Sequence, residues 1–381
     1  MSRNVTLSVL PALESRRSEL ELCGYCPKLC RAACPVSEVE ARETTTPWGK
    51  MSVAWLAARG MVPFDEAHAA SAWACTGCRA CAERCDHHNP VADTLLDVRA
   101  QAFERGVAPE PAKRIAAEFA DYERKTERAI QPLYAEPGTR ADASTALLVG
   151  CTYVHEHPKE TRDAITAASA LAGGAVRILD ACCGQPLLQA GDRAGFRRVA
   201  LRMASRLARI ERLIVVDPGC ALTLRKHYAA EGIQLVSRSG DPLEVELMVD
   251  VAARVLDAFT PLASPPAHPV RYHDPCKLGR GLGSYGPPRS ILTRMLGRRP
   301  DEFPSCREAG GCSGAGGLLP LTSPATSDAI ADRRIGEHVD EGGGEIVTAC
   351  ASSLAKFRAR GAKVSDLVTW IARGLRAPRH P

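Results

Sequence analysis

The sequence has 381 residues, of which 45% are apolar and 24% are charged, and its formal net charge is +5. These values describe an ordinary globular protein with two or three domains. They argue against a nucleic-acid partner, because the charge is mild and no basic block is interleaved with aromatic residues. The unusual feature is the presence of sixteen cysteines.

The first twenty residues, MSRNVTLSVLPALESRRSEL, contain neither the apolar core nor the cleavage pattern of a signal peptide. The longest apolar stretches, VAWLAA and RLIVV, are far shorter than a transmembrane segment. We therefore expect a cytoplasmic protein, with membrane contact at the inner face left open only through a partner or a surface patch. In that compartment the cysteines are expected to be metal ligands or redox groups rather than structural disulfides.

The N-terminal region carries two runs of four cysteines. The first reads C-x2-C-x3-C-x3-C-P and the second C-x2-C-x2-C-x3-C, and matching cysteines lie 52, 52, 51 and 51 residues apart. The runs form an internal pseudo-repeat, separated by a spacer over residues 36–62 that we expect to be mostly helical. Their members are Cys23, Cys26, Cys30 and Cys34, then Cys75, Cys78, Cys81 and Cys85.

The two runs resemble the pattern of the bacterial two-cluster ferredoxins, in which the fourth cysteine of each run binds the cluster of the other. This sequence departs from that pattern in two places: Asp86 stands where proline is usual, and the first run has one extra residue before Cys30. Neither departure removes a ligand that the resemblance implies. A pair of tetrahedral zinc sites is the alternative. The implied ligand sets of two 4Fe-4S clusters are Cys23, Cys26, Cys30 and Cys85, and Cys75, Cys78, Cys81 and Cys34.

Beyond the second run, a charged helical segment extends to about residue 131, and residues 136–144 read as a linker. Two passages of alternating strands and helices follow, separated by a proline-rich boundary at 260–269. Short buried strands alternating with helices predict parallel sheets with Rossmann-like layering. Strands are expected over 145–151, 176–181, 212–217, 233–237, 270–276 and 345–350, with helices over 191–209, from 218, over 287–297, from 324 and at the end of the chain.

Both α/β passages carry cysteines at matching places, with offsets of 125, 130 and 130 residues that indicate a duplication. Asp217–Pro218 and Asp274–Pro275 look like the cap and first position of a helix. Cys220 and Cys276 would then lie in a first helical turn, where the helix dipole lowers the pKa of a thiol. The two sets are Cys151, Cys182, Cys183 and Cys220, then Cys276, Cys312 and Cys350. Cys306 fits no motif and is interpreted as a small buried apolar residue.

The chain resembles a known family, the iron–sulfur oxidoreductases with tandem CCG (cysteine-rich) domains. The segments that carry the likeness are HDPCKLGRGLGSYGPPRSIL, GAGG and the CCG at 182–184. The family includes subunits of heterodisulfide reductase and the iron–sulfur subunits of glycolate oxidase and of anaerobic glycerol-3-phosphate dehydrogenase. The resemblance implies an α+β and α/β architecture: a helical ferredoxin-type two-cluster domain over 1–105, a helical linker over 106–143, and two Rossmann-like CCG domains over 144–262 and 263–381.

The sequence departs from the full motif of the family. Ser313 and Ser353 stand where two cysteines of the second CCG domain are expected, and the first domain has only Cys220 of its final pair. Four thiols in the first domain could hold a third iron–sulfur cluster, whereas three in the second are marginal. The resemblance implies a catalytic role for Cys182 and Cys183. It implies cofactor binding by Cys151, Cys182, Cys183, Cys220, Cys276, Cys312 and Cys350.

The function implied is that of the electron-transfer component of an oxidoreductase. Electrons would arrive from a flavin-dependent dehydrogenase partner, pass through two 4Fe-4S clusters and leave to a quinone or a disulfide. The chain shows no flavin or nicotinamide fingerprint of its own, so an organic donor would be oxidised on the partner. Two alternatives stay open: a non-enzymatic redox sensor or binding protein, and a heterodisulfide reductase-like enzyme acting at the first CCG site.

Overall fold

The computed structural model describes residues 7, 9–24, 26 and 28–375, which form two compact units. The first unit comprises residues 1–119, 186–196 and 308–334, and the second comprises 120–185, 197–307 and 335–381. The stretch searched for an export signal lies partly outside the described residues. Among the described residues, no helix combines the length and the apolar character needed to cross a bilayer.

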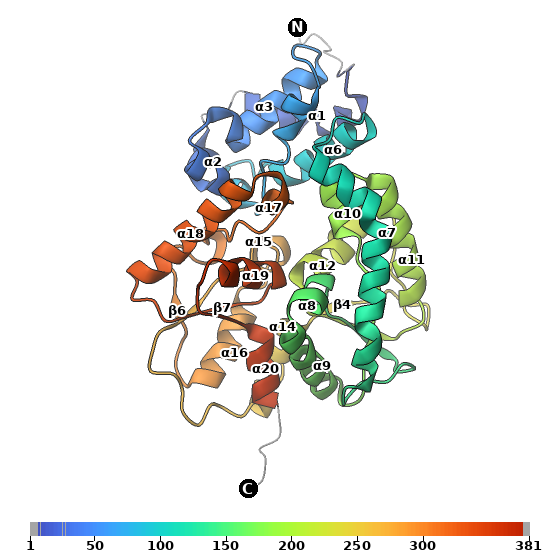
Figure 1. Ribbon diagram of the computed structural model, residues 1–381, viewed down its shortest axis with the longest axis vertical. Helices are drawn as coiled ribbons and strands as arrows, with labels where there is room; N and C mark the ends of the chain where they lie inside the picture. Colours follow the sequence, from blue (N-terminus) through green and yellow to red (C-terminus); the bar gives the residue numbers. More distant parts are fainter. Residues whose placement is uncertain (1–6, 8, 25, 27, 376–381) are drawn as a thin grey trace. The chain divides into compact units, whose positions relative to one another are not determined.

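The first unit consists of short helices and the loops that carry the two cysteine runs (Figure 1). Its core includes Leu20, Met51, Trp73, Leu95 and Val98, all of which are buried. The mostly helical spacer between the runs is confirmed. The helices are η1 Pro11–Arg16, α1 Arg17–Gly24, η2 Leu29–Ala33, α2 Pro35–Glu40, η3 Glu43–Thr45, α3 Pro47–Ala58, α4 Glu66–Ala70, α5 Ala80–Glu83, α6 Val91–Glu104, the first part of α7 Glu110–Ile130, α10 Gln185–Ala190, α17 Leu319–Thr322 and most of α18 Pro324–Asp340.

The local backbone reproduces the pseudo-repeat of the cysteine runs. Lys28 and Arg79 each lie two residues before the third cysteine of their run, and both adopt a left-handed conformation, with φ of 67° and 63°. A short helical turn follows each of them, η2 in the first run and α5 in the second. Non-glycine residues seldom adopt positive φ, so the shared conformation indicates that both loops fold alike from this point onward.

The second unit contains two parallel four-stranded sheets. The first sheet has the order β2-β1-β3-β4 and the second has the order β6-β5-β7-β8, so the second repeats the first with every label raised by four. The duplication inferred from the cysteines is therefore also present in the topology of the sheets. The strands are β1 Thr145–Leu148, β2 Arg177–Ile178, β3 Arg212–Val215, β4 Val245–Leu247, β5 Val270–Tyr272, β6 Asp301–Glu302, β7 Glu345–Thr348 and β8 Val364–Asp366.

Helices connect these strands, as parallel pairing requires. Predicted helices near 191–209, from 218, over 287–297 and from 324 are confirmed. The helices of this unit, some of which begin in the first, are the second part of α7, η4 Gln131–Ala135, α8 Cys151–Glu156, α9 Pro158–Ala172, α11 Arg193–Leu207, α12 Pro218–Leu222, the π-helical turn η5 Thr223–His227, α13 Tyr228–Ala230, α14 Met248–Ala253, η6 Leu256–Ala258, α15 Gly279–Leu282, α16 Gly286–Leu296, η7 Arg307–Ala309, the end of α18, α19 Ala351–Ala359 and α20 Leu367–Leu375.

The predicted strand over 233–237 is wrong. The fourth strand of the first sheet is β4, which begins at Val245, twelve residues after the predicted start, and β3 pairs with it from Leu213 to Val215. The charged Glu246 in the middle of β4 hides this strand from a hydrophobicity pattern. It is accommodated because Arg212 and Arg254 both bind its carboxylate, at 2.6 and 3.1 Å.

The two predicted Asp-Pro helix caps have different outcomes. The Asp217 carboxylate accepts hydrogen bonds from the backbone N–H groups of Gly219 and Cys220 and caps α12, as expected. Asp274 caps no helix, so the prediction that Cys276 lies in a first helical turn is wrong. The Asp274 carboxylate instead binds both terminal nitrogens of Arg289, at 2.7 and 2.8 Å. Cys276 lies in the turn that precedes α15.

Candidate iron–sulfur sites

Cysteines from both runs line one small pocket of the first unit. Cys34 comes from the end of the first run, and the other three thiols come from the start of the second run. The second set, Cys34, Cys75, Cys78 and Cys81, is the one expected from crossed ligation. Burial raises the pKa of Cys81 well above its ordinary value, and the neighbouring Cys78, Cys75 and Cys34 thiols raise it further. Such mutual repulsion is what a shared cation relieves.

The other four cysteines also influence one another. Burial raises the pKa of Cys23 to about 12, and the Cys30, Cys26 and Cys85 thiols add to the shift. Cys85, from the second run, thus lies close enough to act on the first member of the first run. We call Cys23, Cys26, Cys30 and Cys85 the first set.

Two side chains that the sequence analysis did not single out donate hydrogen bonds to these thiols. Asn89 Nδ2 lies 3.1 Å from Cys23 Sγ, and Lys50 Nζ lies 3.6 Å from Cys34 Sγ. Both residues are buried. Hydrogen bonds to cysteine sulfur are among the features that tune iron–sulfur clusters. Neither residue has a cysteine-like spacing signal, so only the folded structure could reveal them.

The donor chemistry fits iron–sulfur clusters. Each set offers four thiols and no nitrogen or carboxylate ligand, which is the composition that 4Fe-4S clusters use. Within the described part of the chain, no three Cys, His, Asp or Glu side chains converge as the ligands of one metal ion would. In a cube each thiolate binds a different iron, so its ligands need not converge on one point.

A loop of the second CCG segment packs on the second cysteine run inside the first unit. Cys312 Sγ lies 3.6 Å from Thr76 Oγ1. A Cβ at Gly316 would approach the carbonyl oxygen of Thr76 to 2.3 Å, and a Cβ at Gly317 that of Cys75 to 2.0 Å. The glycines of GGCSGAGG therefore allow two backbones to touch beside cluster ligands. Cys312 belongs to this unit, whereas Cys276 and Cys350 belong to the second.

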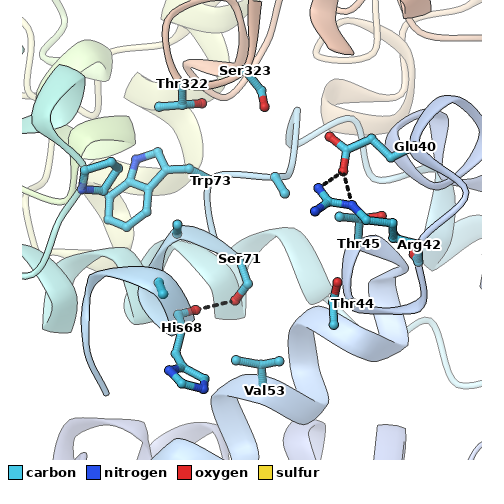
Figure 2. Close-up of a pocket in the computed structure, with 14 residues that line it drawn as sticks. Glu40, Arg42, Thr44, Thr45, Val53, His68, Ser71, Trp73, Thr322 and Ser323 are labelled. Atoms are coloured by element: carbon cyan, nitrogen blue, oxygen red, sulfur yellow. Dashed lines mark hydrogen bonds and ion pairs between the residues drawn. The ribbon is translucent and has the colours of Figure 1, made fainter. Parts of the chain in front are cut away.

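A larger pocket of about 340 Å³ lies beside the second set, in the same unit (Figure 2). Thr45 and Ala74 line it, and the carbonyl oxygen of Thr45 is 3.9 Å from Cys34 Sγ while Ala74 directly precedes Cys75. Its remaining wall is mixed, with apolar residues such as Val53 and polar ones such as His68. The size is that of a small-molecule site.

The four thiols of the first CCG segment form a buried group in the second unit. Cys183 Sγ and Cys220 Sγ are 3.4 Å apart. Hydrogen bonds from the Cys182 and Cys220 thiols lower the pKa of Cys183 well below its ordinary value. The pKa of Cys182 is raised, chiefly by hydrogen bonds with Cys151 and Cys183. Of these cysteines, Cys183 is therefore the one stabilised as a thiolate.

The expected thiolate at Cys220 is not supported. Its hydrogen bond with Cys183, together with burial, raises the pKa of Cys220 well above its ordinary value. The helix that follows Asp217 continues from α12 through η5 into α13, and its dipole does not outweigh the effect of these neighbours on the Cys220 thiol. Burial and the Cys183 thiol raise the pKa of Asp217 itself to about 6.

Asp217 connects the two CCG segments. Besides capping α12, its carboxylate accepts a hydrogen bond from the N–H of Ala351, the first residue of α19. Cys350 precedes that helix, and burial, with Asp217 as the next cause, raises the pKa of Cys350 to about 12. Asp217 and Cys350 each lie two residues after the end of their strand, β3 and β7. They occupy equivalent places in the duplicated fold, so Ser353 corresponds to Cys220, and the pairing of Cys350 with Cys220 by sequence offset is wrong.

Comparison with known proteins identifies the same segments. Residues 19–89 match a 4Fe-4S dicluster domain, and residues 145–225 and 270–358 each match a cysteine-rich domain known as CCG. The predicted combination of domains is confirmed, and the dicluster match supports 4Fe-4S clusters over zinc.

Relatives with functional names match the chain over part of their own length. The chain is 26% identical to a fumarate reductase (CoM/CoB) subunit of Methanothermobacter marburgensis, over 80% of this chain and 61% of that protein. It is 27% identical to a probable membrane-anchored ferredoxin of Chromohalobacter salexigens, over 74% of this chain and 44% of that protein. A subunit of the dihydromethanophenazine:CoB–CoM heterodisulfide reductase of Methanosarcina acetivorans is 35% identical over 21% of this chain and 20% of its own. The chain thus spans less than two thirds of each of these relatives.

Proposed function

This chain belongs to the iron–sulfur oxidoreductases that join a 4Fe-4S dicluster domain to paired CCG domains, and we propose that it is an electron-transfer subunit with two 4Fe-4S clusters. The observation that supports this most is the pocket lined by Cys34, Cys75, Cys78 and Cys81. A set made from both runs is what crossed ligation requires. We propose the first set and the second set as the two ligand sets.

The residues around each set have separate tasks. The tight turns at Lys28 and Arg79 present the third cysteine of each run. Asn89 and Lys50 direct polar hydrogens at one thiol of each set. Cys23, Cys34 and Cys78 are buried, and the other five ligand cysteines are half-buried. When bound, the clusters would supply one-electron carriers, which is the chemistry that an electron-transfer subunit needs.

The CCG segments would be the exit for electrons. The four thiols of the first CCG segment are buried together and could hold a third cluster. Two of them, Cys182 and Cys183, are adjacent in the sequence. We propose a flavin-dependent dehydrogenase as the donor partner and a quinone or a disulfide as the acceptor, in the cytoplasm or at the inner face of the membrane. Relatives that are subunits of larger reductases support the need for a partner.

The experiment that tests the proposal is metal and sulfide analysis of anaerobically purified protein. We expect about eight irons and eight acid-labile sulfides from the two ligand sets, since each 4Fe-4S cluster holds four of each. A third cluster would raise both numbers to about twelve. Stoichiometric zinc without acid-labile sulfide would overturn the proposal.

A second candidate function is reduction of a disulfide at the first CCG segment, with no cluster bound there. It is favoured by the lowered pKa of Cys183 and by the 3.4 Å separation of Cys183 Sγ and Cys220 Sγ. The Cys183 thiolate would attack a substrate disulfide and release one thiol. Cys220 would then displace the second, leaving a Cys183–Cys220 disulfide that two electrons and two protons reduce. An iron content of about eight, with turnover of a disulfide but not of a quinone, would favour this function.

A further inference from the structure

Lys50 is a buried cation without a carboxylate partner. It lies in the first turn of α3, whose Thr46 cap fixes the start of the helix, and the residue is only 1% exposed. The one hydrogen bond of its side chain within the described structure is to Cys34 Sγ, at 3.6 Å. Burying an ammonium group is unfavourable unless an anion compensates for the lost hydration. The position therefore requires a negative group close by.

The Glu40 carboxylate, on which Lys50 acts electrostatically, is already occupied by other partners. Glu40 pairs with Arg42 and accepts a hydrogen bond from Thr326 at 2.7 Å. Both interactions lower the pKa of Glu40 more than Lys50 does. Figure 2 shows Glu40 and Arg42 bound to each other on the wall of the larger pocket. Glu40 thus does not neutralise Lys50.

The thiols of the second set would become the compensating anions when they bind a cluster. Lys50 lines the same small pocket as Cys34, Cys75, Cys78 and Cys81. We propose that Lys50 is a positioning residue for redox potential: its ammonium group raises the reduction potential of the cluster bound by the second set above that of the cluster bound by the first. A positive charge beside a cluster stabilises the reduced, more negative state.

The first set lacks an equivalent buried charge among the described residues. Its cysteine Cys23 receives a hydrogen bond from Asn89, a neutral amide that also donates to the carbonyl oxygen of Glu19. A neutral N–H donor stabilises a reduced cluster less than a buried ammonium does. The proposal therefore gives the second site a higher reduction potential than the first. Electrons that enter at the first set would collect at the second, next to the loop that carries Cys312 and next to the larger pocket.

The test is potentiometric titration of the purified holoprotein, followed by paramagnetic resonance of the reduced clusters. In Lys50→Met, the midpoint potential of the second cluster should become more negative, while that of the first stays unchanged. Lys50→Arg keeps the charge and should remain near the wild type. Lys113→Met removes a partly exposed lysine of α7 and should shift neither potential. The second cluster is identified as the signal that Cys34→Ser perturbs.

Unchanged potentials in Lys50→Met, or an equal shift of both clusters, would overturn the proposal. Should Lys50→Met not retain the second cluster, Lys50→Gln is measured in the same way. Loss of the cluster from both variants would also count against the proposal, because Lys50 would then serve assembly rather than potential. The inference rests on the proposed ligand sets, whose own failure would appear separately as missing iron and sulfide in the wild type.

Discussion

Asp366 shows how a single buried carboxyl group ties the duplicated α/β segments together. Its Oδ2 accepts a hydrogen bond from the hydroxyl of Tyr153 at 2.7 Å, and its Oδ1 accepts one from the N–H of Val368 at 2.8 Å. Tyr153 lies in α8 of the first segment, whereas Asp366 ends β8 of the second. Burial raises the pKa of Asp366 to about 7, despite both hydrogen bonds. The group is thus protonated in the folded protein at mildly acidic pH.

This pKa predicts a specific pH dependence of stability. The unfolded carboxyl group ionises near pH 3.9, and the folded one near pH 7. Between these values the folded state binds more protons, so the free energy of unfolding falls as the pH rises from about 4 to 7. The loss from this group is on the order of 4 kcal/mol at most, at 1.36 kcal/mol per pKa unit.

Asp366→Asn should remove that dependence. Relative to the wild type, the variant should gain stability steadily between about pH 4 and 7, as measured by anaerobic urea unfolding at each pH. Buried groups that do not act on Asp366 are present in both proteins and cancel in the comparison. A stability difference between the two proteins that does not change with pH would show that Asp366 is ionised when folded.

Cys183 and Cys312 should differ in importance. Cys183 belongs to the buried group of four thiols and is the one stabilised as a thiolate, whereas Cys312 contacts the hydroxyl of Thr76. In Cys183→Ala we expect reoxidation of the reduced clusters by the acceptor to slow by more than about 100-fold. In Cys312→Ala the rate should change by about tenfold at most, the lower end of the range for an outer-sphere contact. Equal damage by both substitutions, with circular dichroism unchanged, would contradict this asymmetry.

The GGCSGAGG loop illustrates how one element supports the cluster ligands of another. Gly317 has a φ of 68°, and a Cβ there would lie 2.0 Å from the carbonyl oxygen of Cys75. The buried Arg99 of α6 donates to the same carbonyl oxygen, at 2.9 Å, and to that of Ala72. The loop that starts the second run is therefore held from two sides, by a close glycine contact and by a guanidinium group.

Gly317→Ala should disturb this loop. The new methyl group would displace the Cys75 backbone, so we expect a loss of more than about 2 kcal/mol in stability and a weakened signal of the second cluster. Gly336→Ala is the matched control, because Gly336 lies in α18 with nothing within 4 Å of its added Cβ. That variant should be unchanged or slightly more stable. Thermal unfolding and paramagnetic resonance of both variants distinguish these outcomes.

Elements whose signals are local in sequence were predictable, whereas those that depend on distant contacts were not. The cysteine spacings anticipated two similar loops, and Asp217–Pro218 anticipated the start of α12, because each involves only neighbouring residues. Strand β4 was misplaced because its central Glu246 is stabilised by arginines that pattern analysis cannot pair with it. Asp274 was wrongly predicted to cap a helix for the same reason, because its carboxylate binds the distant Arg289.

Repetition is the organising feature of the whole molecule. Two cysteine runs with matching turns form the dicluster segment, and two sheets of identical order form the CCG segments. Each duplication has become asymmetric at its chemical groups. Lys50 faces one ligand set and Asn89 the other, while Asp217 and Cys350 occupy equivalent places after β3 and β7. A repeated scaffold with different groups beside its repeated sites can give the electron carriers different reduction potentials, so that electrons move in one direction.

Crossed ligation between the two runs makes a prediction that uncrossed ligation does not. If Cys34 completes the second set, Cys34→Ser should damage the cluster bound with Cys75, Cys78 and Cys81 and spare the other, because serine is a poor iron ligand. Cys85→Ser should damage the cluster bound with Cys23, Cys26 and Cys30. The pocket that Cys34 shares with the second run, and the effect of Cys85 on the pKa of Cys23, both support this exchange.

The measurement is paramagnetic resonance of the two reduced variants, with iron content determined on the same samples. Each variant should lose one signal, and the signal that is lost should differ between them. The Lys50 hydrogen bond supplies an internal check, because Cys34→Ser removes its sulfur acceptor. Lys50→Met and Cys34→Ser should therefore affect the same cluster, and Cys85→Ser the other one. Loss of the same signal in Cys34→Ser and Cys85→Ser would contradict crossed ligation, since one cluster would then depend on the last cysteine of both runs.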